Sequence, residues 1–304
     1  MLPEFDLLTP QTLPEALDML AEGTPDVVPL AGGTNLIVDL RAGRYRPGVL
    51  VNVAGLDELR FIRRENRHIV MGGGVTITEL LEDPLIAQYA PVLREAAAVF
   101  ANPLVRNRAT VGGNLVDGSP AANMPPPLLV LDAEVELASK DGARRIPLDD
   151  FLVGVRQTLR RPDELLTAIR WPVPPPRSAA AFYKIGLRKS DAIAVVSAAV
   201  MVEGDVGAGP APARCTQARI ALGSVAPRVI RARAAEETLR GQPLTDEVIA
   251  EAARLSAGVA CPIDDIRGSA AYRQRVTEVL VRRLLTEAAN QRISEEERAC
   301  NQKS

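Results

Sequence analysis

Two short glycine-containing segments constrain the fold of this chain more than any other feature of its sequence. The first is AGGTN at residues 31–35, inside the apolar stretch PLAGGTNLIVDL, and the second is TVGGN at residues 110–114. Each places a threonine and an asparagine beside two consecutive glycines. A Gly-Gly pair between apolar runs most often forms a hairpin turn, because glycine adopts positive φ without a steric penalty. Either segment alone is therefore explained by a plain turn.

Taken together, the two segments support a second interpretation, in which bare backbone surrounds a ligand. If they lie side by side, their N–H groups would line a concave site, and successive N–H donors bind a pyrophosphate without any lysine or arginine. Side-chain hydrogen bonds would come from Thr34, Asn35, Thr110 and Asn114. No G-x-G-x-x-G or Gly-Lys-Ser/Thr motif occurs, and no capped helix is expected directly after Gly33. The pair thus predicts phosphate binding by loops of a different fold.

The composition excludes several other classes of function. The chain has 304 residues, enough for two domains, with 36 basic and 38 acidic residues and a net charge of −2. This balance and the 3% aromatic content give no support for nucleic-acid binding. No apolar run approaches the roughly 20 residues of a transmembrane helix, and the acidic N-terminus does not resemble a signal peptide.

The cysteines and the single histidine exclude a metal centre of any familiar spacing. Cys215, Cys261 and Cys300 lie far apart, no CxxC pair occurs, and His68 is the only histidine. The chain is therefore not expected to bind an iron–sulfur cluster or a structural zinc by itself. This cysteine usage fits a reduced, cytoplasmic environment.

The apolar spacing predicts a mixture of strands and helices. Two helix starts, Thr12–Glu15 and Thr76–Glu79, have the pattern of a capping box. Both glycine motifs are expected to be loops, as is the stretch 118–127. Strands are expected over 27–30, 50–53, 69–71, 128–137, 165–173, 194–202 and 218–224, and further helices over 91–100, 245–258 and 269–290.

The proline-rich stretch PVPPPRS at 172–178 is the best candidate for a linker. Beyond it, strands followed by helices indicate a further α+β unit. GDVGAGPAPA at 204–213 is expected to be a hairpin tip, and the tail EEERACNQKS at 295–304 is expected to be frayed or held by a partner.

With these segments in view, nearly the whole chain resembles the flavin subunits of molybdenum-containing hydroxylases. This family includes the medium subunit of aerobic carbon monoxide dehydrogenase and the central domain of xanthine dehydrogenase. The resemblance is carried by EFDLLTPQTLPEAL, PLAGGTNLIVDLR, GGGVTITEL, NPLVRNRATVGGNLVDGSPAAN, FYKIGLRKSDAIAVVSAA, ALGSVAPRVIRARAAE and GSAAYRQRVTEVLVRRLL.

The resemblance implies an α+β fold in two parts. Residues 1–176 would form an FAD-binding domain of two α+β subdomains, of the vanillyl-alcohol-oxidase/PCMH type. Residues 177–290 would form a C-terminal α+β domain of the CO dehydrogenase flavoprotein type, and residues 291–304 a tail.

The resemblance also implies which residues bind FAD. The first motif would wrap the pyrophosphate, with Leu30, Ala31, Gly32, Gly33, Thr34, Asn35 and Leu36. The second would close over the pyrophosphate and ribityl side, with Thr110, Gly112, Gly113 and Asn114. Phe100 and Leu166 would lie against the flavin ring, although plain core packing explains both residues nearly as well.

Three further positions bear on the electronics of the flavin. Lys184 would lie near the pyrimidine edge, where a cation stabilises anionic reduced flavin; the alternative is a solvated surface lysine. Asn123 stands where relatives often carry an aspartate that bonds flavin or ribityl hydroxyls, so the local potential should differ. KSDAI retains only Asp191 of an acidic pair found in xanthine dehydrogenase-like chains, which weakens the case for NAD as acceptor.

The implied function is electron transfer, with no catalytic side chain expected in this chain. A large molybdopterin-binding subunit would hydroxylate the substrate, and a small subunit with 2Fe-2S clusters would relay electrons to the FAD. The assembly would be a dimer of heterotrimers. The acceptor stays open among quinone, oxygen, NAD and ferredoxin.

Two other functions remain as alternatives. PLAGGTNLIV also resembles the glycine loop of UDP-N-acetylenolpyruvoylglucosamine reductase, a single-chain FAD enzyme that needs a protein proton donor, usually a serine, and an NADPH site. Ser190, Ser197 and Ser224 are available, but none lies in a matching motif. The other alternative is a flavin-binding module without redox turnover.

Overall fold

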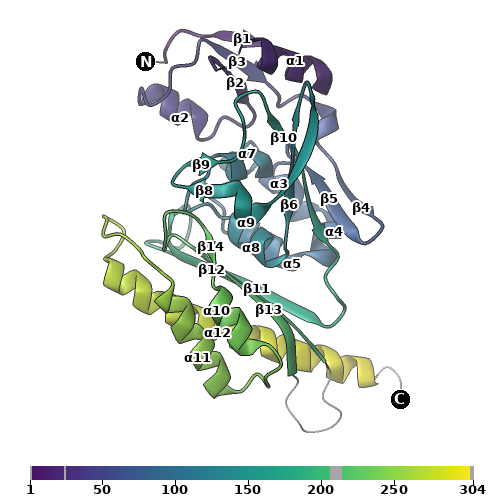
Figure 1. Ribbon diagram of the computed structural model, residues 1–304, viewed down its shortest axis with the longest axis vertical. Helices are drawn as coiled ribbons and strands as arrows, with labels where there is room; N and C mark the ends of the chain where they lie inside the picture. The colour runs from purple at the N-terminus through teal and green to yellow at the C-terminus, as the bar shows by residue number, and fades with distance from the viewer. Residues whose placement is uncertain (1, 24, 206–213, 302–304) are drawn as a thin grey trace. The chain divides into compact units, whose positions relative to one another are not determined.

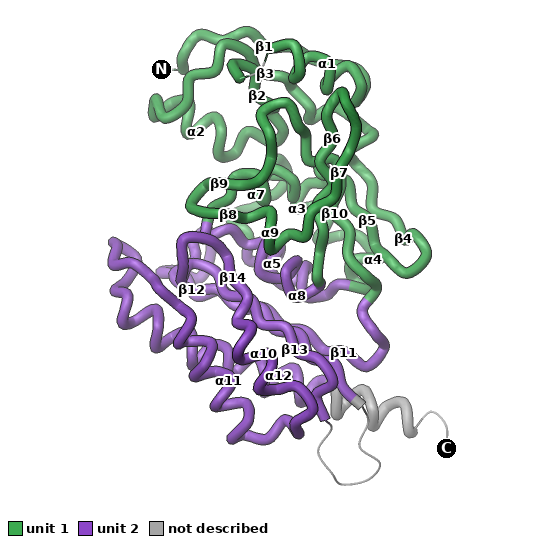
Figure 2. The backbone as a smooth tube through the Cα atoms, in the orientation of Figure 1, with its two compact units in different colours: residues 1–89, 100–119, 132–173 green, residues 90–99, 120–131, 174–304 purple. Residues whose placement is uncertain are grey.

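The structure is a computed structural model that describes residues 2–23, 25–205 and 214–301. It divides into two compact units, coloured separately in Figure 2. The first unit comprises Met1–Tyr89, Phe100–Ser119 and Asp132–Val173, and the second comprises Ala90–Val99, Pro120–Leu131 and Pro174–Ser304. Both units mix helices and strands, which confirms the α+β class (Figure 1). The domain boundary at residue 176 stays a prediction; the chain passes between the units for the last time inside the proline-rich stretch.

The first unit begins with a parallel sheet of three strands in the order β1-β3-β2. β1 (Asp6–Leu8) and β2 (Val27–Leu30) both pair in parallel with the central strand β3 (Val49–Asn52). α1 (Leu13–Gly23) packs on this sheet with its apolar face, and α2 (Leu36–Arg41) follows directly after β2 and the first glycine motif. The edge of this sheet therefore carries the first motif.

The rest of the first unit is built on an antiparallel sheet of five strands in the order β4-β5-β10-β6-β7. Its strands are β4 (Ile62–Glu65), β5 (His68–Gly72), β10 (Leu165–Pro172), β6 (Glu134–Ser139) and β7 (Gly142–Pro147). Shorter elements complete the unit: η1 (Asp57–Leu59), α3 (Ile77–Glu82), α4 (Pro84–Tyr89), α6 (Pro103–Arg106), α7 (Val111–Val116), α9 (Leu148–Phe151) and the two-stranded ribbon of β8 (Leu152–Gly154) and β9 (Gln157–Thr158).

The two expected capping boxes differ in detail. At α3 the box is complete, since Thr76 N–H donates to the Glu79 carboxylate at 2.8 Å and Glu79 N–H donates to Thr76 Oγ1 at 3.2 Å. At α1 Glu15 N–H donates to Thr12 Oγ1 at 3.3 Å, but the Glu15 carboxylate accepts from Gln11 N–H instead of from Thr12 N–H. Both helices begin where the sequence predicts.

The second unit is a four-stranded antiparallel sheet covered by helices on both faces. The sheet order is β11 (Ser178–Gly186), β12 (Ala194–Asp205), β13 (Arg214–Gly223) and β14 (Ile230–Arg231). Figure 1 shows one face covered by α10 (Arg233–Leu239), α11 (Asp246–Gly258) and α12 (Ala270–Asn301), and the other by α5 (Pro91–Ala98) and α8 (Pro125–Val130). Small and β-branched residues such as Ala198, Val200 and Ile220 fill the core between these layers.

One expected strand is wrong. The segment 128–137 forms the end of α8 followed by β6, with Asp132 at φ +52° between them. Pro125, Pro126 and Pro127 occupy the first turn of α8, where proline costs no hydrogen bond, and Leu128–Val130 are buried. A short apolar run buried on all sides does not reveal its periodicity, which explains the error.

Two further expectations concern the hairpin tip and the tail. Gly204 and Asp205 belong to β12, and the rest of the expected tip at 204–213 lies outside the described residues. α12 continues to Asn301, so most of the expected tail at 295–304 is helical, and residues 302–304 lie outside the described part. Among the described residues no helix has the length and apolar character needed to cross a membrane.

Candidate functional site

The first glycine motif connects β2 to α2 through a turn that only glycine adopts readily. Gly33 has φ +71°, and its carbonyl oxygen accepts a hydrogen bond from Ile37 N–H at 3.1 Å. Asn35 is the N-cap residue of α2 but makes no side-chain capping bond. A helix therefore does begin after the motif, but it lacks a side-chain cap, which agrees with the expectation that no capped helix follows Gly33.

The backbone of the first motif offers a row of unused donors. In the part of the chain that the structure describes, no protein acceptor takes the N–H groups of Gly32, Gly33, Thr34 or Asn35. Gly32, Gly33 and Thr34 are half-buried, and Asn35 is exposed. Successive backbone N–H groups that no protein acceptor uses form a concavity of the kind that binds a phosphate group.

Gly32 also brings the two motifs together. A Cβ atom at Gly32 would lie 1.8 Å from the backbone oxygen of Arg108 and 3.0 Å from the nitrogen of Ala109. Arg108 and Ala109 lead directly into the second motif. The expectation that the motifs lie side by side holds within the first unit. Gly32 is required by this contact between two segments of the chain, whether or not a ligand binds.

The second motif is a helix start and not a loop, which corrects the sequence prediction. Thr110 is the N-cap of α7, and its Oγ1 accepts from Gly113 N–H at 3.0 Å. Val111 N–H donates to Val75 O at 2.9 Å, Gly112 N–H to Gly73 O at 3.0 Å, and Asn114 N–H to Thr110 O at 3.0 Å. These backbone donors are used within the protein, because tertiary bonds and the cap outweigh the low helix propensity of Gly-Gly.

Gly112 is needed for packing in the same way as Gly32. A Cβ atom there would lie 2.5 Å from Gly73 O, so α7 lies directly against the Gly72–Gly74 run. Gly113, in contrast, is exposed, and its Cβ would meet only Thr110 Oγ1 at 2.8 Å. Of the second motif, Gly113 and the half-buried Asn114 are therefore the members with surface available to a ligand.

The two residues expected against a flavin ring have different surroundings. Leu166 is 4% exposed at a β-bulge in β10, and its backbone oxygen lies 2.2 Å from where a Cβ of Gly73 would stand. Phe100 is half-buried, its carbonyl oxygen accepts from Arg106 Nη1 at 3.0 Å, and Ala101 follows in the left-handed region at φ +35°. Core packing accounts for Leu166, whereas the strained backbone beside Phe100 is typical of a constrained site.

Asn123 and Lys184 belong to the second unit and share one acceptor there. Lys184 Nζ donates to Val99 O and, at 3.1 Å, to Ala192 O. Asn123 is 7% exposed, and its Nδ2 donates at 3.4 Å to Ala96 O and Val99 O. Burial lowers the pKa of Lys184. The alternative of a solvated surface lysine therefore does not fit, because the ammonium group is held by two carbonyls in a half-buried position.

Sequence reasoning missed three charged residues that connect the helices of the two motifs. Arg156, in the turn between β8 and β9, forms ion pairs with Asp39 on α2 and with Asp117 at the end of α7. The hydrogen bond to Asp39 is the main cause of a raised pKa at Arg156. Residues separated by 39 and 117 positions leave no local pattern that could have indicated them.

Comparison with known proteins assigns the chain to a family. Residues 3–174 match the family described as FAD binding domain in molybdopterin dehydrogenase, and residues 181–288 match the CO dehydrogenase flavoprotein C-terminal domain. The chain therefore belongs to the family of flavoprotein subunits of molybdopterin-dependent dehydrogenases, a class of oxidoreductases with FAD in this subunit.

Several relatives match over almost their entire length. The chain is 34% identical to the 6-hydroxypseudooxynicotine dehydrogenase complex subunit alpha of Paenarthrobacter nicotinovorans, covering 94% of this chain and 95% of the relative. It is 33% identical to the carbon monoxide dehydrogenase medium chain of Afipia carboxidovorans, covering 93% and 96%. The solved carbon monoxide dehydrogenase of Hydrogenophaga pseudoflava superposes with a TM-score of 0.90 at 32% identity, covering 96% of this chain and 99% of that chain. The resemblance and the fold class inferred from the sequence are thereby confirmed.

Proposed function

We propose that this chain is the electron-transfer subunit of a heteromeric molybdenum hydroxylase. It would take electrons from the 2Fe-2S clusters of a small subunit and pass them through FAD to an external acceptor. The observation that carries this proposal is the row of four backbone N–H groups at Gly32–Asn35, which have no acceptor among the protein residues that the structure describes, inside a domain of the FAD-binding family. The donor set fits a pyrophosphate, which accepts several hydrogen bonds at once and needs no side-chain cation.

Each part of the site would have a separate task in holding FAD. The first motif would donate backbone hydrogen bonds to the pyrophosphate, while Gly113 and Asn114 would border it from the second motif. Phe100 and Leu166 would shield the flavin ring from water. Lys184 and Asn123 would set the electrostatic potential near its edge. Bound FAD supplies the redox chemistry, and the chain supplies binding, orientation and electrostatics.

The names of the relatives support a multi-subunit assembly. The relatives from Paenarthrobacter nicotinovorans and Afipia carboxidovorans are named as a complex subunit and a medium chain. We infer that the molybdopterin cofactor belongs to a large partner and the 2Fe-2S clusters to a small partner of this chain. The dimer of heterotrimers, the cytoplasmic location and the identity of the acceptor stay predictions.

The alternative of a self-sufficient reductase gains no support from the site. Such an enzyme needs a proton donor within reach of its substrate. Ser197 and Ser224 are 1% and 6% exposed in the second unit, so neither hydroxyl faces solvent. Ser190 lies in the 187–193 connection, where its backbone oxygen accepts from Arg188 Nε at 3.1 Å.

Copurification and flavin analysis test the proposal together. The full chain, produced with its neighbouring genes and purified through a tag, is expected to contain one noncovalent FAD and to bring with it a molybdopterin-binding chain and a two-cluster iron–sulfur chain. Reoxidation of the reduced complex by quinone, oxygen, NAD and ferredoxin would then identify the acceptor. A chain that purifies alone, or without any capacity for FAD, would contradict the proposal.

A further inference from the structure

One side chain connects the helices that follow the two glycine motifs. Arg156 Nη2 donates to Asp39 Oδ2 on α2, and at 2.8 Å to Asp117 Oδ1 at the C-cap of α7. Arg156 Nη1 approaches the other oxygen of Asp39 at 3.5 Å. Because α2 begins after AGGTN and α7 begins within TVGGN, this guanidinium fixes the spacing between the helices that the motifs open.

The two carboxylates depend on this arginine. The side chains of Asp39 and Asp117 are each 11% exposed, and one nitrogen atom of Arg156 contacts both of them. Arg44 also bonds Asp39, at 2.6 Å, but it is 61% exposed and makes no such bridge between helices. Without Arg156, Asp39 would keep only the exposed Arg44, and the two poorly solvated carboxylates would no longer share a cation between α2 and α7, so their like charges would repel.

The backbone around Arg156 holds the guanidinium in place. Arg156 has φ +55°, and its N–H donates to Gly118 O at 3.0 Å. Gly118 itself has φ +60°, and a Cβ there would lie 3.2 Å from Arg156 Cα. The turn between β8 and β9 is thus packed directly on the residue that follows Asp117, so the ion pairs extend from an anchored segment.

We propose that Arg156 is a positioning residue for FAD, which holds the first motif and α7 at the separation that lets both contact one pyrophosphate. The inference depends on the proposed function, since it assigns Arg156 a task toward the ligand of that site. Arg156 acts through Asp39 and Asp117 and makes no contact of its own with the phosphates. Its loss is expected to weaken FAD binding more than it lowers the stability of the fold.

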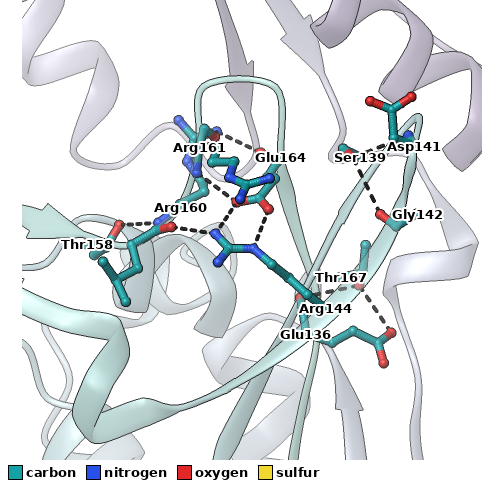
Figure 3. Close-up of polar contacts among 11 residues, drawn as sticks. Glu136, Ser139, Asp141, Gly142, Arg144, Thr158, Arg160, Arg161, Glu164 and Thr167 are labelled. Carbon is teal, nitrogen blue, oxygen red and sulfur yellow. Dashed lines mark hydrogen bonds and ion pairs between the residues drawn. The ribbon is translucent and has the colours of Figure 1, made fainter.

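The test compares the FAD affinity of variants at position 156 and its partner with that of a control variant of similar stability. Arg156→Met removes both ion pairs, and Asp117→Ala removes only the connection to α7. The matched control is Arg144→Met, because Arg144 also pairs with a buried carboxylate of the first unit, Glu164, at 2.6 and 2.9 Å (Figure 3). This second ion pair touches neither glycine motif nor α2 or α7. The dissociation constant of FAD is measured by fluorescence titration of the apo chain, well below the melting temperature of each variant.

Arg156→Met is expected to raise the dissociation constant at least tenfold and Asp117→Ala at least threefold, while Arg144→Met changes it less than twofold at a similar melting temperature. Equal FAD affinity in wild type and Arg156→Met would overturn the inference, as would an equal loss in Arg144→Met. If Arg156→Met does not fold, Asp117→Ala decides alone, and an unchanged affinity there is the contradicting result. A wild-type chain that binds no FAD would instead contradict the proposed function itself.

Discussion

Replacing Gly32 with alanine tests the contact that joins the two motifs. The new Cβ atom would stand 1.8 Å from Arg108 O and 2.5 Å from Arg108 C. Both are backbone atoms, so no side-chain rotation can make room, and the two segments must separate by more than about 1 Å. Inserting a group into a closely packed contact typically costs about 1–3 kcal/mol of the free energy of unfolding.

The effect on ligand binding should exceed the effect on stability. A displacement of about 1 Å moves the amides of Gly32–Asn35 out of line with a pyrophosphate that also contacts α7. Losing one or two hydrogen bonds to a charged phosphate costs about 3 kcal/mol, which is roughly a hundredfold in affinity. Urea unfolding of the apo chain and fluorescence titration with FAD measure the two effects separately.

Gly55→Ala is the matched control for this experiment. Gly55 lies in the same unit, has no heavy atom within 4 Å of an added Cβ, and does not have positive φ. It is expected to change neither quantity appreciably. Surface substitutions usually change the free energy of unfolding by less than about 0.5 kcal/mol. If Gly32→Ala also stays within this range and binds FAD as tightly as wild type, the close approach to Arg108 is not a feature of the folded protein.

Three further substitutions have defined outcomes in the second unit. Asn123→Asp places a carboxylate against the carbonyl of Val99 and should lower the free energy of unfolding by about 2 kcal/mol at pH 7 and by less at pH 4. An equal loss at both pH values in urea titrations would contradict this. Ser224→Gly removes a side chain at φ +65° with a buried, unpartnered hydroxyl and should stabilise the chain by about 1 kcal/mol, seen as a higher melting temperature; a lower one would refute the strain. Burial raises the pKa of Glu95, although the carboxylate accepts a hydrogen bond from Phe182 N–H at 2.7 Å. Glu95 therefore keeps its proton to a higher pH in the folded protein than in the unfolded chain, and its contribution to stability is lost as the pH rises above the ordinary pKa of 4.5. Glu95→Gln should therefore gain stability relative to wild type as pH rises through this range, and a constant difference would argue against the raised pKa.

Much of the fold could be predicted from local patterns. β2, β5 and α3 lie at the predicted positions, because alternation, β-branched residues and the Thr76–Glu79 capping box are signals contained in a few neighbouring residues. α8 could not be predicted in this way. Its three prolines and the apolar residues after them are compatible with a loop and a strand until the packing against β12 and β13 is known.

The candidate site shows the same division between local and tertiary information. The positive φ of Gly33 and the proximity of the two motifs follow from the glycine pattern and from the resemblance. The contact between Gly32 and Arg108, the helical form of Thr110–Val116, and the bridge through Arg156 depend on residues far apart in the chain. The bare backbone was expected to let a pyrophosphate approach, and the structure adds that Gly32 and Gly112 are required by the packing of the chain on itself.

The central claim is that the amides of Gly32–Asn35 hold the pyrophosphate of FAD. Hydrogen–deuterium exchange of the full chain, resolved to single residues with and without saturating FAD, tests it directly. Within the described ranges of the chain the four amides have no protein acceptor, so they should exchange quickly in the apo chain and become strongly protected when FAD binds. Gly112, whose N–H donates to Gly73 O, should be protected in both states. FAD that binds without slowing exchange at Gly32–Asn35 would contradict the account.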